Sequence, residues 1–257
     1  MAIRTTWRTT WSALAVCAGL WTAAGATEVV TIAAEDDWAP YSSMRADRAG
    51  PEGLAPALVK AAFKTQDVDV RFEVVPFSRC LHYAEKGTVL GCFDTTRTDA
   101  NKDQFYWHPT PLFQEELAIF ARSDVPGRDL TEKDLEGQTV GVTIGYTYPT
   151  EFMQNPRITK LSAVSDSNLV KMLVARRVNF ILLNTMPGYY RIKHEPRLRG
   201  QIKRVGAIRL DSFWVSFSRT HPDGRRMCDV FEKGLQAIKA NGEYDRMMSA
   251  FKRELQP

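Results

Sequence analysis

The fold of this chain is decided by a stretch in its middle, Asp134-Leu135-Glu136-Gly137-Gln138-Thr139-Val140-Gly141-Val142-Thr143-Ile144-Gly145-Tyr146-Thr147. This stretch contains an acidic turn, a glycine, a short apolar strand and a second turn that begins with glycine. A turn of the second kind presents backbone N–H groups that can hold an anionic or polar group. The pattern therefore favours a ligand-binding turn over a catalytic one.

The N-terminal residues 1–26 have the features of a secretory signal peptide. Arg4 and Arg8 precede an apolar segment over 11–21, and the small residues 24–26 follow it. The apolar segment is too short to span a bilayer comfortably. We expect cleavage after Ala26 and a soluble mature protein in the periplasm.

Removal of 26 of the 257 residues leaves 231, and the loss of two arginines lowers the formal charge from +4 to +2. This length suits one large or two small domains with real hydrophobic cores. A nucleic-acid-binding surface would concentrate Lys and Arg on one face, whereas here the signs are interspersed. We expect a small-molecule partner, no nucleic acid and a monomer.

Three cysteines remain after processing, and two of them are candidates for a disulfide. Cys80 begins a predicted helix and Cys92 lies in the strand that follows it. The start of such a helix and the end of the next parallel strand lie at the same edge of a sheet, so a bridge is geometrically reasonable. The alternative is that both are buried thiols, and we expect Cys228 to be a buried thiol as well.

The chain alternates strands and helices as a parallel α/β protein does. Apolar alternation and helical spacing predict strands over 27–34, 68–75, 89–94, 117–121, 140–144, 180–183 and 213–217, and helices over 54–64, 78–86, 167–175, 222–239 and 242–254. The charge-rich segment 122–136 connects two such units. Two lobes joined by two crossings would enclose a hinged cleft.

These features together resemble the bacterial extracellular solute-binding proteins of family 3, the amino-acid type that serves ABC transporters. The resemblance covers residues 27–257, and it rests on the order and spacing of several motifs taken together. They are Trp38-Ala39-Pro40-Tyr41, Gly53-Leu54, Val75-Pro76-Phe77-Ser78-Arg79, Leu135-Glu136-Gly137-Gln138-Thr139-Val140-Gly141, Ser218-Arg219-Thr220-His221-Pro222-Asp223 and Ala240-Asn241-Gly242-Glu243-Tyr244.

The resemblance implies a two-lobed periplasmic-binding-protein fold of the type II kind, in which each lobe is a mainly parallel sheet flanked by helices. It implies a first lobe made of 27–118 and 211–257, a second lobe made of 119–210, and a ligand held between them. A ligand closes such lobes only by the affinity it gains from touching both of them. An inner-membrane ABC permease is the implied partner.

The chain departs from the family at both charged contacts. Typical members hold an amino-acid carboxylate with an arginine after the third strand, where this chain has Asn101, and Arg97 or Lys102 would have to substitute. They hold the ammonium with an aspartate after a strand of the second lobe, where this chain has Asn184. Loss of a charge-assisted contact costs more than loss of a neutral one, so an ordinary α-amino acid is a doubtful ligand.

We expect the cleft to hold an amino-acid-like, aromatic or organic-acid ligand against flat aromatic walls. Trp38 and Tyr41 have the alternative role of packing aromatics, and Arg97 that of an ion-pair partner for Asp94 or Asp99. The residues expected at the site are Asp37, Trp38, Tyr41, Phe77, Phe93, Asp94, Thr95, Arg97, Gly145, Tyr146, Thr147, Asn184 and Trp214.

Two other functions stay open. One is an enzyme on the same scaffold, similar to periplasmic cyclohexadienyl dehydratases, for which Asp37, Asp94 and Glu52 are the candidate acids. The other is a sensing or accessory role without transport. No hydrolase elbow, phosphate loop or paired metal-ligand spacing is present in the sequence, so we expect a binding protein without catalytic residues, metal or cofactor.

Overall fold

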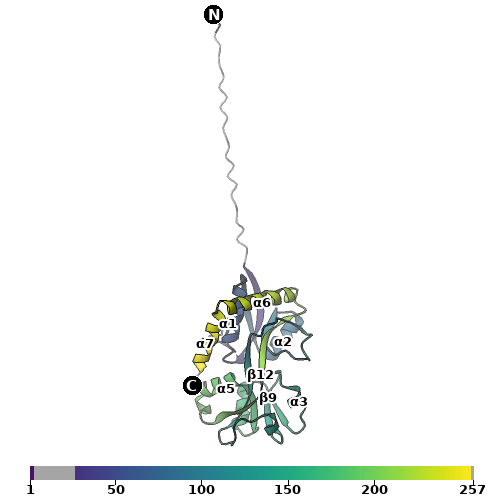
Figure 1. The fold of residues 1–257 in the computed structure, drawn as a ribbon, viewed down its shortest axis with the longest axis vertical. Coiled ribbons are helices and arrows are strands. Elements are labelled where there is room, and N and C mark those ends of the chain that lie inside the picture. The colour runs from purple at the N-terminus through teal and green to yellow at the C-terminus, as the bar shows by residue number, and fades with distance from the viewer. Residues whose placement is uncertain (3–26, 256–257) are drawn as a thin grey trace.

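The computed structural model describes residues 1–2 and 27–255 and shows an α/β molecule of two lobes (Figure 1). Two long antiparallel strands, β8 (Phe113–Arg122) and β12 (Ile202–Ser218), run from one lobe into the other. The predicted fold class is confirmed. The predicted signal peptide comprises residues 1–26, and positions 3–26 of it lie outside the described residues. None of the described helices is both long and apolar enough to cross a membrane.

The first lobe is built on a sheet in which β1 (Glu28–Glu35) lies between two parallel neighbours, β5 (Val68–Val75) and β6 (Gly91–Thr95). Its short strands are β2 (Asp37–Trp38), β3 (Ser42–Met44), β4 (Pro51–Glu52) and β7 (Phe105–Trp107). Its helices are α1 (Leu54–Lys64), α2 (Phe77–Lys86), α6 (Gly224–Ala240) and α7 (Glu243–Leu255).

A close approach of α1 to α6 organises the core of this lobe. A Cβ atom at Gly234 of α6 would lie 2.1 Å from the carbonyl oxygen of Ala62 in α1, so only glycine fits there. The contact brings the ring of Phe63 to 5.2 Å from that of Phe231, and Phe217 of β12 packs against both. All three rings are fully buried, and burial of each contributes about 2–3 kcal/mol to stability.

The second lobe has a smaller parallel sheet in which β9 (Thr139–Thr143) lies between β10 (Thr159–Ala163) and β11 (Phe180–Asn184). Strand β11 pairs antiparallel with β8, which joins this sheet to the crossing strands. The helical segments of the lobe are η1 (Glu132–Leu135), α3 (Thr150–Gln154), α4 (Asp166–Val174), α5 (Thr185–His194) and η2 (Pro196–Leu198).

The stretch that decides the fold forms a capped turn followed by a buried strand. The Asp134 carboxylate accepts hydrogen bonds from the backbone N–H and the hydroxyl of Thr131, which starts η1. Further on, a Cβ atom at Gly141 of β9 would lie 2.7 Å from Leu169, so the glycine allows α4 to pack directly on the strand. The strand thereby ends at a fixed position on the edge of the lobe.

The crossing strands pair over most of their length, from Ile202 opposite Arg122 to Phe213 opposite Phe113. The lobe boundaries expected at 118/119 and 210/211 fall inside these two strands. At 210/211 the boundary separates two hydrophobic cores, since Ile208 packs on one and Phe213 lies in the other, whereas at 118/119 residues on both sides share the cores of the second lobe. The assignment of each chain segment to a lobe stays a prediction.

Several elements differ from the sequence-based prediction. Strand β12 has 17 residues, whereas apolar alternation indicated only 213–217. Its first half mixes apolar residues with Lys203, Arg204 and Arg209, and two register shifts interrupt its pairing with β8, so the alternation of apolar residues is lost there. Strands β7 and β10 and helices α3 and α5 were not predicted, because they are short or carry mixed polar residues.

Cys80 and Cys92 form a disulfide, as expected from their positions at one edge of the sheet, with their Cα atoms 5.5 Å apart. The bridge joins the first turn of α2 to β6. Among the described cysteines, Cys228 is unpaired and buried in α6. It lies in the core of the first lobe, as a small apolar residue would.

Candidate ligand-binding cleft

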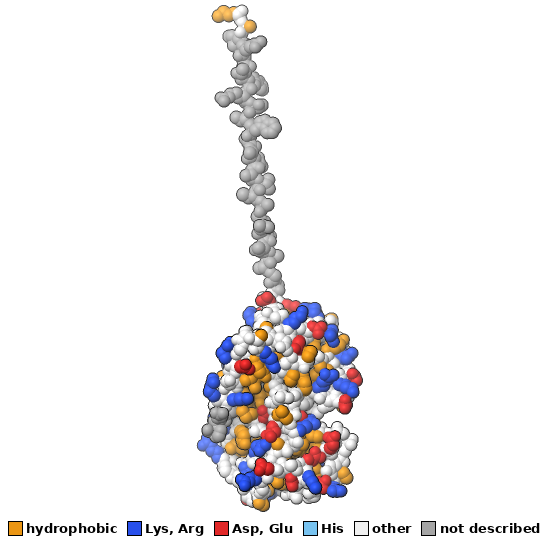
Figure 2. Space-filling view, in the orientation of Figure 1, with side chains coloured by type: hydrophobic (Ala, Val, Ile, Leu, Met, Phe, Trp, Pro, Cys, Tyr) orange, Lys and Arg blue, Asp and Glu red, His pale blue; other side chains and the backbone are white. Residues whose placement is uncertain are grey.

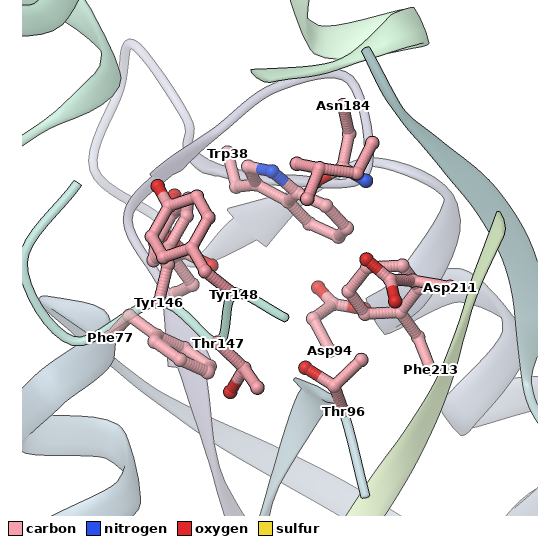
Figure 3. A pocket seen from close by; sticks show the side chains of 12 residues that line it. Trp38, Phe77, Asp94, Thr96, Tyr146, Thr147, Tyr148, Asn184, Asp211 and Phe213 are labelled. Atoms are coloured by element: carbon pink, nitrogen blue, oxygen red, sulfur yellow. The ribbon is translucent and has the colours of Figure 1, made fainter. Parts of the chain in front are cut away.

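Two connected cavities lie between the lobes, and the molecular surface is hollowed at this position on its right-hand edge (Figure 2). We call the deep one the inner cavity and the wide one the outer cavity. Their empty space amounts to about 390 and about 1570 Å³, and both values include open solvent at the mouth. The inner cavity is lined by Glu35, Trp38, Phe77, Asp94, Thr96, Leu117, Tyr146, Thr147, Tyr148, Asn184, Asp211 and Phe213 (Figure 3).

The inner cavity lies where the carboxyl ends of parallel strands from both lobes meet. Strand β1 ends at Glu35, β6 supplies Asp94, and β11 ends at Asn184. The turn after β9 supplies residues 146–148. In open α/β sheets this edge is where ligands bind, because the strands end there and the loops diverge. The cleft therefore follows from the topology of the two sheets.

Asp94 is the most unusual residue of the inner cavity. The residue is only 4 % exposed. Both of its carboxylate oxygens lack a hydrogen-bond partner among the described residues. Its φ of 61° lies in the left-handed region, which costs energy for a residue other than glycine. Burial raises the pKa of Asp94 well above its usual range. Figure 3 shows this carboxyl group facing the space between Trp38, Thr147 and Phe213.

Glu35 joins the two lobes at one side of the cavity. The hydroxyl of Tyr146, from the turn after β9, donates a 2.6 Å hydrogen bond to the Glu35 carboxylate on β1. Burial raises the pKa of Glu35, and the hydrogen bond from Tyr146 opposes that rise. Glu35 is 5 % exposed, so this bond is shielded from water and links the lobes strongly.

A second link between the lobes involves Asp37. Arg191 of α5 donates to the Asp37 carboxylate over 2.9 Å and to the hydroxyl of Ser167 over 2.8 Å. Asp166, whose pKa burial raises to about 6, is also held near this arginine, and it accepts a 2.7 Å bond from Thr143. Asp37 was expected to contact the ligand; the structure pairs it with Arg191, outside the inner cavity.

Trp38 forms a wall of the inner cavity and is 2 % exposed. Its ring lies 4.7 Å from that of Tyr41 and 5.0 Å from that of Phe213, so the indole is fixed by rings on two sides. The Trp38 Nε1 donor has no hydrogen-bond partner among the described residues. A buried donor of this kind is normally satisfied, so it can bind an acceptor that enters the cavity.

Three of the expected residues lie one layer behind the cavity. Tyr41 stacks on Phe113 with ring centroids 4.4 Å apart, and its hydroxyl donates a hydrogen bond to the Glu115 carboxylate. Phe93 is fully buried in the core of the first lobe, and Thr95 contacts the Ser216 hydroxyl at 3.1 Å. Their rings and hydroxyls support the residues in front of them, because side chains alternate between the two faces along β6.

Arg97 and Trp214 line the outer cavity. Arg97 is exposed, and it makes no ion pair or side-chain hydrogen bond with another described residue, so neither Asp94 nor Asp99 is its partner. Asn101, which the sequence resemblance predicts at the position of the family's arginine, accepts from the Thr98 N–H at 2.7 Å and donates to the Thr96 carbonyl at 2.8 Å. Its side chain therefore shapes the turn and is not free for a ligand.

The turn after β9 brings three expected residues together at the cleft. Gly145 has a φ of 85°, and a Cβ atom there would lie 3.4 Å from Ser78 of the first lobe, so the lobes approach closely at this glycine. Tyr146 and Thr147 line both cavities. Phe77, from the start of α2, contacts the Tyr146 ring edge to face at 5.6 Å.

Six residues that line the inner cavity were missed by sequence reasoning: Glu35, Thr96, Leu117, Tyr148, Asp211 and Phe213. Asp211 is 7 % exposed and is paired with Arg209; burial raises its pKa and Arg209 opposes that rise. The end of β1 was a usable signal for Glu35, because the preceding strand was predicted. Asp211 had no such signal, because its part of β12 was not recognised as a strand.

The chemistry of the site is that of reversible binding by carboxylates and aromatic rings. Within residues 1–2 and 27–255, no group of three or more His, Cys, Asp or Glu side chains is arranged to hold a metal ion. The inner cavity has three carboxyl side chains, five aromatic rings and one amide, contributed by both lobes. A ligand that fills it would contact both lobes at once.

Comparison with known proteins identifies what this chain is similar to. The family model of the bacterial extracellular solute-binding proteins, family 3, matches residues 30–253. No curated protein matches the chain. A solved ancestral arginine-binding protein bound to arginine is 19 % identical, with 87 % of this chain and 97 % of that chain covered and a TM-score of 0.76.

Two further solved structures share the fold. An arginine third transport system periplasmic binding protein from Legionella pneumophila is 18 % identical, with 87 % of this chain and 99 % of that chain covered and a TM-score of 0.75. A histidine kinase sensor domain with similarity to periplasmic binding proteins is 20 % identical, with 87 % and 95 % covered and a TM-score of 0.77.

Proposed function

The chain belongs to the bacterial extracellular solute-binding proteins of family 3, and from this membership we propose that it captures a small polar ligand between its two lobes and delivers it to an ABC permease. The observation that carries the proposal is the inner cavity, where buried polar groups without partners face a space bounded by both lobes. Such groups are costly unless a ligand pairs with them.

The closing of the lobes supplies the physical basis of capture. Trp38 and Asp94 belong to the first lobe, whereas Thr147 and Asn184 belong to the second. A ligand that contacts both pairs favours the closed state by the free energy of the contacts that only this state provides. A permease can then distinguish the loaded protein from the empty one by its shape.

The cellular setting completes the proposal. The predicted signal peptide would export the chain to the periplasm, with cleavage after Ala26. There the mature chain would act as a monomer, with the disulfide between Cys80 and Cys92 suited to an oxidising compartment. Its proposed partners are the ligand and an inner-membrane permease.

A sensing role is a second candidate, favoured by the similarity to the histidine kinase sensor domain. In that role ligand closure would be reported to a partner protein and not to a permease. The binding event is the same in both roles, so the two differ only in what recognises the closed form. Loss of ligand uptake on deletion of the gene would favour transport, and loss of a transcriptional response without loss of uptake would favour sensing.

An enzyme on this scaffold is favoured by one observation, the buried carboxyl groups of raised pKa in the inner cavity. Glu35 and Asp94 both have this property, and a dehydratase of this fold would need such an acid. We propose binding without turnover, because the three similar structures described above are those of binding or sensor proteins. Recovery of the bound compound distinguishes the two functions.

The test is a thermal-shift screen of residues 27–257 against amino acids, amines, aromatic acids and sugars. A ligand that binds only the folded protein must raise its melting temperature. We expect at least one compound to raise it by several degrees and to be recovered unchanged by mass spectrometry. Chemical conversion of the compound would replace the proposal with an enzymatic function, and the absence of any shift across the four classes would contradict ligand capture.

A further inference from the structure

Building on the proposed function, we propose that the ligand is a small organic cation, an ammonium or guanidinium group on a short apolar body, whose charge is held by Asp94 in the inner cavity. The ligand would not need the carboxylate that an α-amino acid carries. Four features of the described residues support this: the state of Asp94, the charge balance of the cavity, its aromatic walls, and the absence of a buried cation for an anionic group.

Asp94 is placed as a binding group whose partner comes from outside the chain. It is 96 % buried, both its oxygens lack partners among the described residues, and it faces the cavity (Figure 3). Burial raises the pKa of Asp94, and no positive side chain among residues 27–255 offsets that rise. A buried carboxyl group without a partner is costly when it is charged, and a cation that binds it offsets that cost.

The charge balance of the inner cavity also favours a cation. Glu35 and Asp211 add two further carboxyl groups, whereas none of the described residues that line this cavity is Lys, Arg or His. The guanidinium of Arg209 pairs with Asp211 from the outer cavity, and Tyr146 bonds to Glu35. Of the three carboxyl groups, only Asp94 has no partner among the described residues, so it can pair with one positive charge on a ligand.

The walls of the cavity fit an organic cation and not a metal ion. Five aromatic residues line it, and aromatic faces attract cations as well as apolar groups. Its carboxyl groups are spread around the space, and they form no cluster of three that could hold a metal ion within the described residues. The enclosed space of the inner cavity is only about 30 Å³, so the lobes must move apart to admit a ligand, and the ligand must be compact.

An anionic group would find no Lys, Arg or His among the described residues that line the inner cavity, where the unpartnered donor is the uncharged indole N–H of Trp38. Asn101 uses its side chain to hold the turn at Thr96 and Thr98. Arg97 is exposed in the outer cavity, where solvent and salt screen its charge. A carboxylate on the ligand would thus gain little from this chain. This replaces the sequence-based expectation that Arg97 holds an anionic group.

The experiment is isothermal titration calorimetry of residues 27–257 at pH 8 with paired probes of equal body and different charge. Phenethylamine is compared with phenylacetate and phenylalanine, and agmatine with arginine. We expect one of the two amines to bind at least about 30-fold more tightly than its carboxylate-bearing counterparts, the scale of a buried charge-assisted contact. The comparison uses wild-type protein alone and does not depend on the folding of a variant.

Two variants identify the residue that holds the charge. Asp94→Asn keeps the size and the left-handed backbone preference but removes the charge, so it should weaken binding of the amine at least about 30-fold. Asp229→Asn is the matched control, because Asp229 is exposed on α6 and pairs only with Arg225. It should leave the affinity within about twofold.

The outcomes separate this inference from the proposed function. Binding of phenylacetate or of the amino acids without binding of the amines would overturn the cation and leave ligand capture standing. Equal amine affinity in wild type and Asp94→Asn would overturn the assignment to Asp94. Binding of none of the five probes would also overturn the inference, while ligand capture would then be decided by the thermal-shift screen.

Discussion

The substitution Asp94→Asn should make the empty protein more stable at pH 8 and leave its stability at pH 4 almost unchanged. In the unfolded chain Asp94 has a pKa of about 3.9. In the folded chain burial raises that pKa well above its usual range, so the folded state holds a proton that the unfolded state releases. Stability from this group is therefore complete below about pH 4 and is lost as the pH rises through the folded pKa.

The magnitude follows from the linkage of one proton. Between the unfolded and folded pKa values of Asp94, wild-type stability should fall by about 1.4 kcal/mol per pH unit relative to the variant. For a chain of this length that corresponds to about 3–5 °C in melting temperature per pH unit. Glu35, Asp166 and Asp211 also have raised pKa values, but they are present in both proteins and largely cancel in the difference.

The assay is differential scanning calorimetry of both proteins at intervals from pH 4 to pH 8 without ligand. We expect the difference in melting temperature to grow steadily with pH over this range. The charge of Asp94 also raises the pKa of Glu35, so its removal acts in the same direction. A difference that does not change with pH would refute the reasoning, because it would mean that Asp94 ionises in the folded protein as it does in water.

Three further predictions concern other parts of the structure. Replacing Cys80 and Cys92 with alanine opens a loop with a sequence separation of 12, so stability should fall by about 3 kcal/mol and the melting temperature by about 6–12 °C in calorimetry; a fall below 2 °C would contradict it. Tyr146→Phe removes the 2.6 Å bond to Glu35 and should cost about 1–3 kcal/mol in urea unfolding, and an unchanged midpoint would show that the bond contributes nothing. Arg97→Ala should change the affinity for the amine less than about threefold in titration calorimetry, since this exposed charge is screened; a tenfold loss would place an anionic group of the ligand beside it.

The sequence predicts the fold well where hydrophobic patterns are strong. The parallel strands β1, β5, β9 and β11 and the helices α1, α2, α4 and α6 are apolar on their buried faces, and their positions were anticipated within a few residues. Strand β12 was recognised only at its end. Its first half pairs with β8 through backbone hydrogen bonds, but two register shifts and interspersed Lys and Arg residues break the alternation of side chains by which a strand is recognised.

The candidate site was predicted in part, for a related reason. Trp38, Asp94 and Thr147 lie in turns directly after or at the ends of predicted strands, so topology places them at the cleft. Tyr41 and Phe93 lie behind the cleft because the direction of each side chain depends on local register, which the sequence does not reveal. The unpartnered state of Asp94 depends on every neighbouring element of both lobes, so only the structure could show it.

A crystal structure of residues 27–257 with the organic cation that binds most tightly would show directly which group holds the charge of the ligand. The account predicts a cationic nitrogen within about 2.7–3.2 Å of the Asp94 carboxylate, with the body of the ligand between the lobes beside Trp38 and Phe213. A ligand seated in the outer cavity against Arg97, with Asp94 still without a partner, would contradict it.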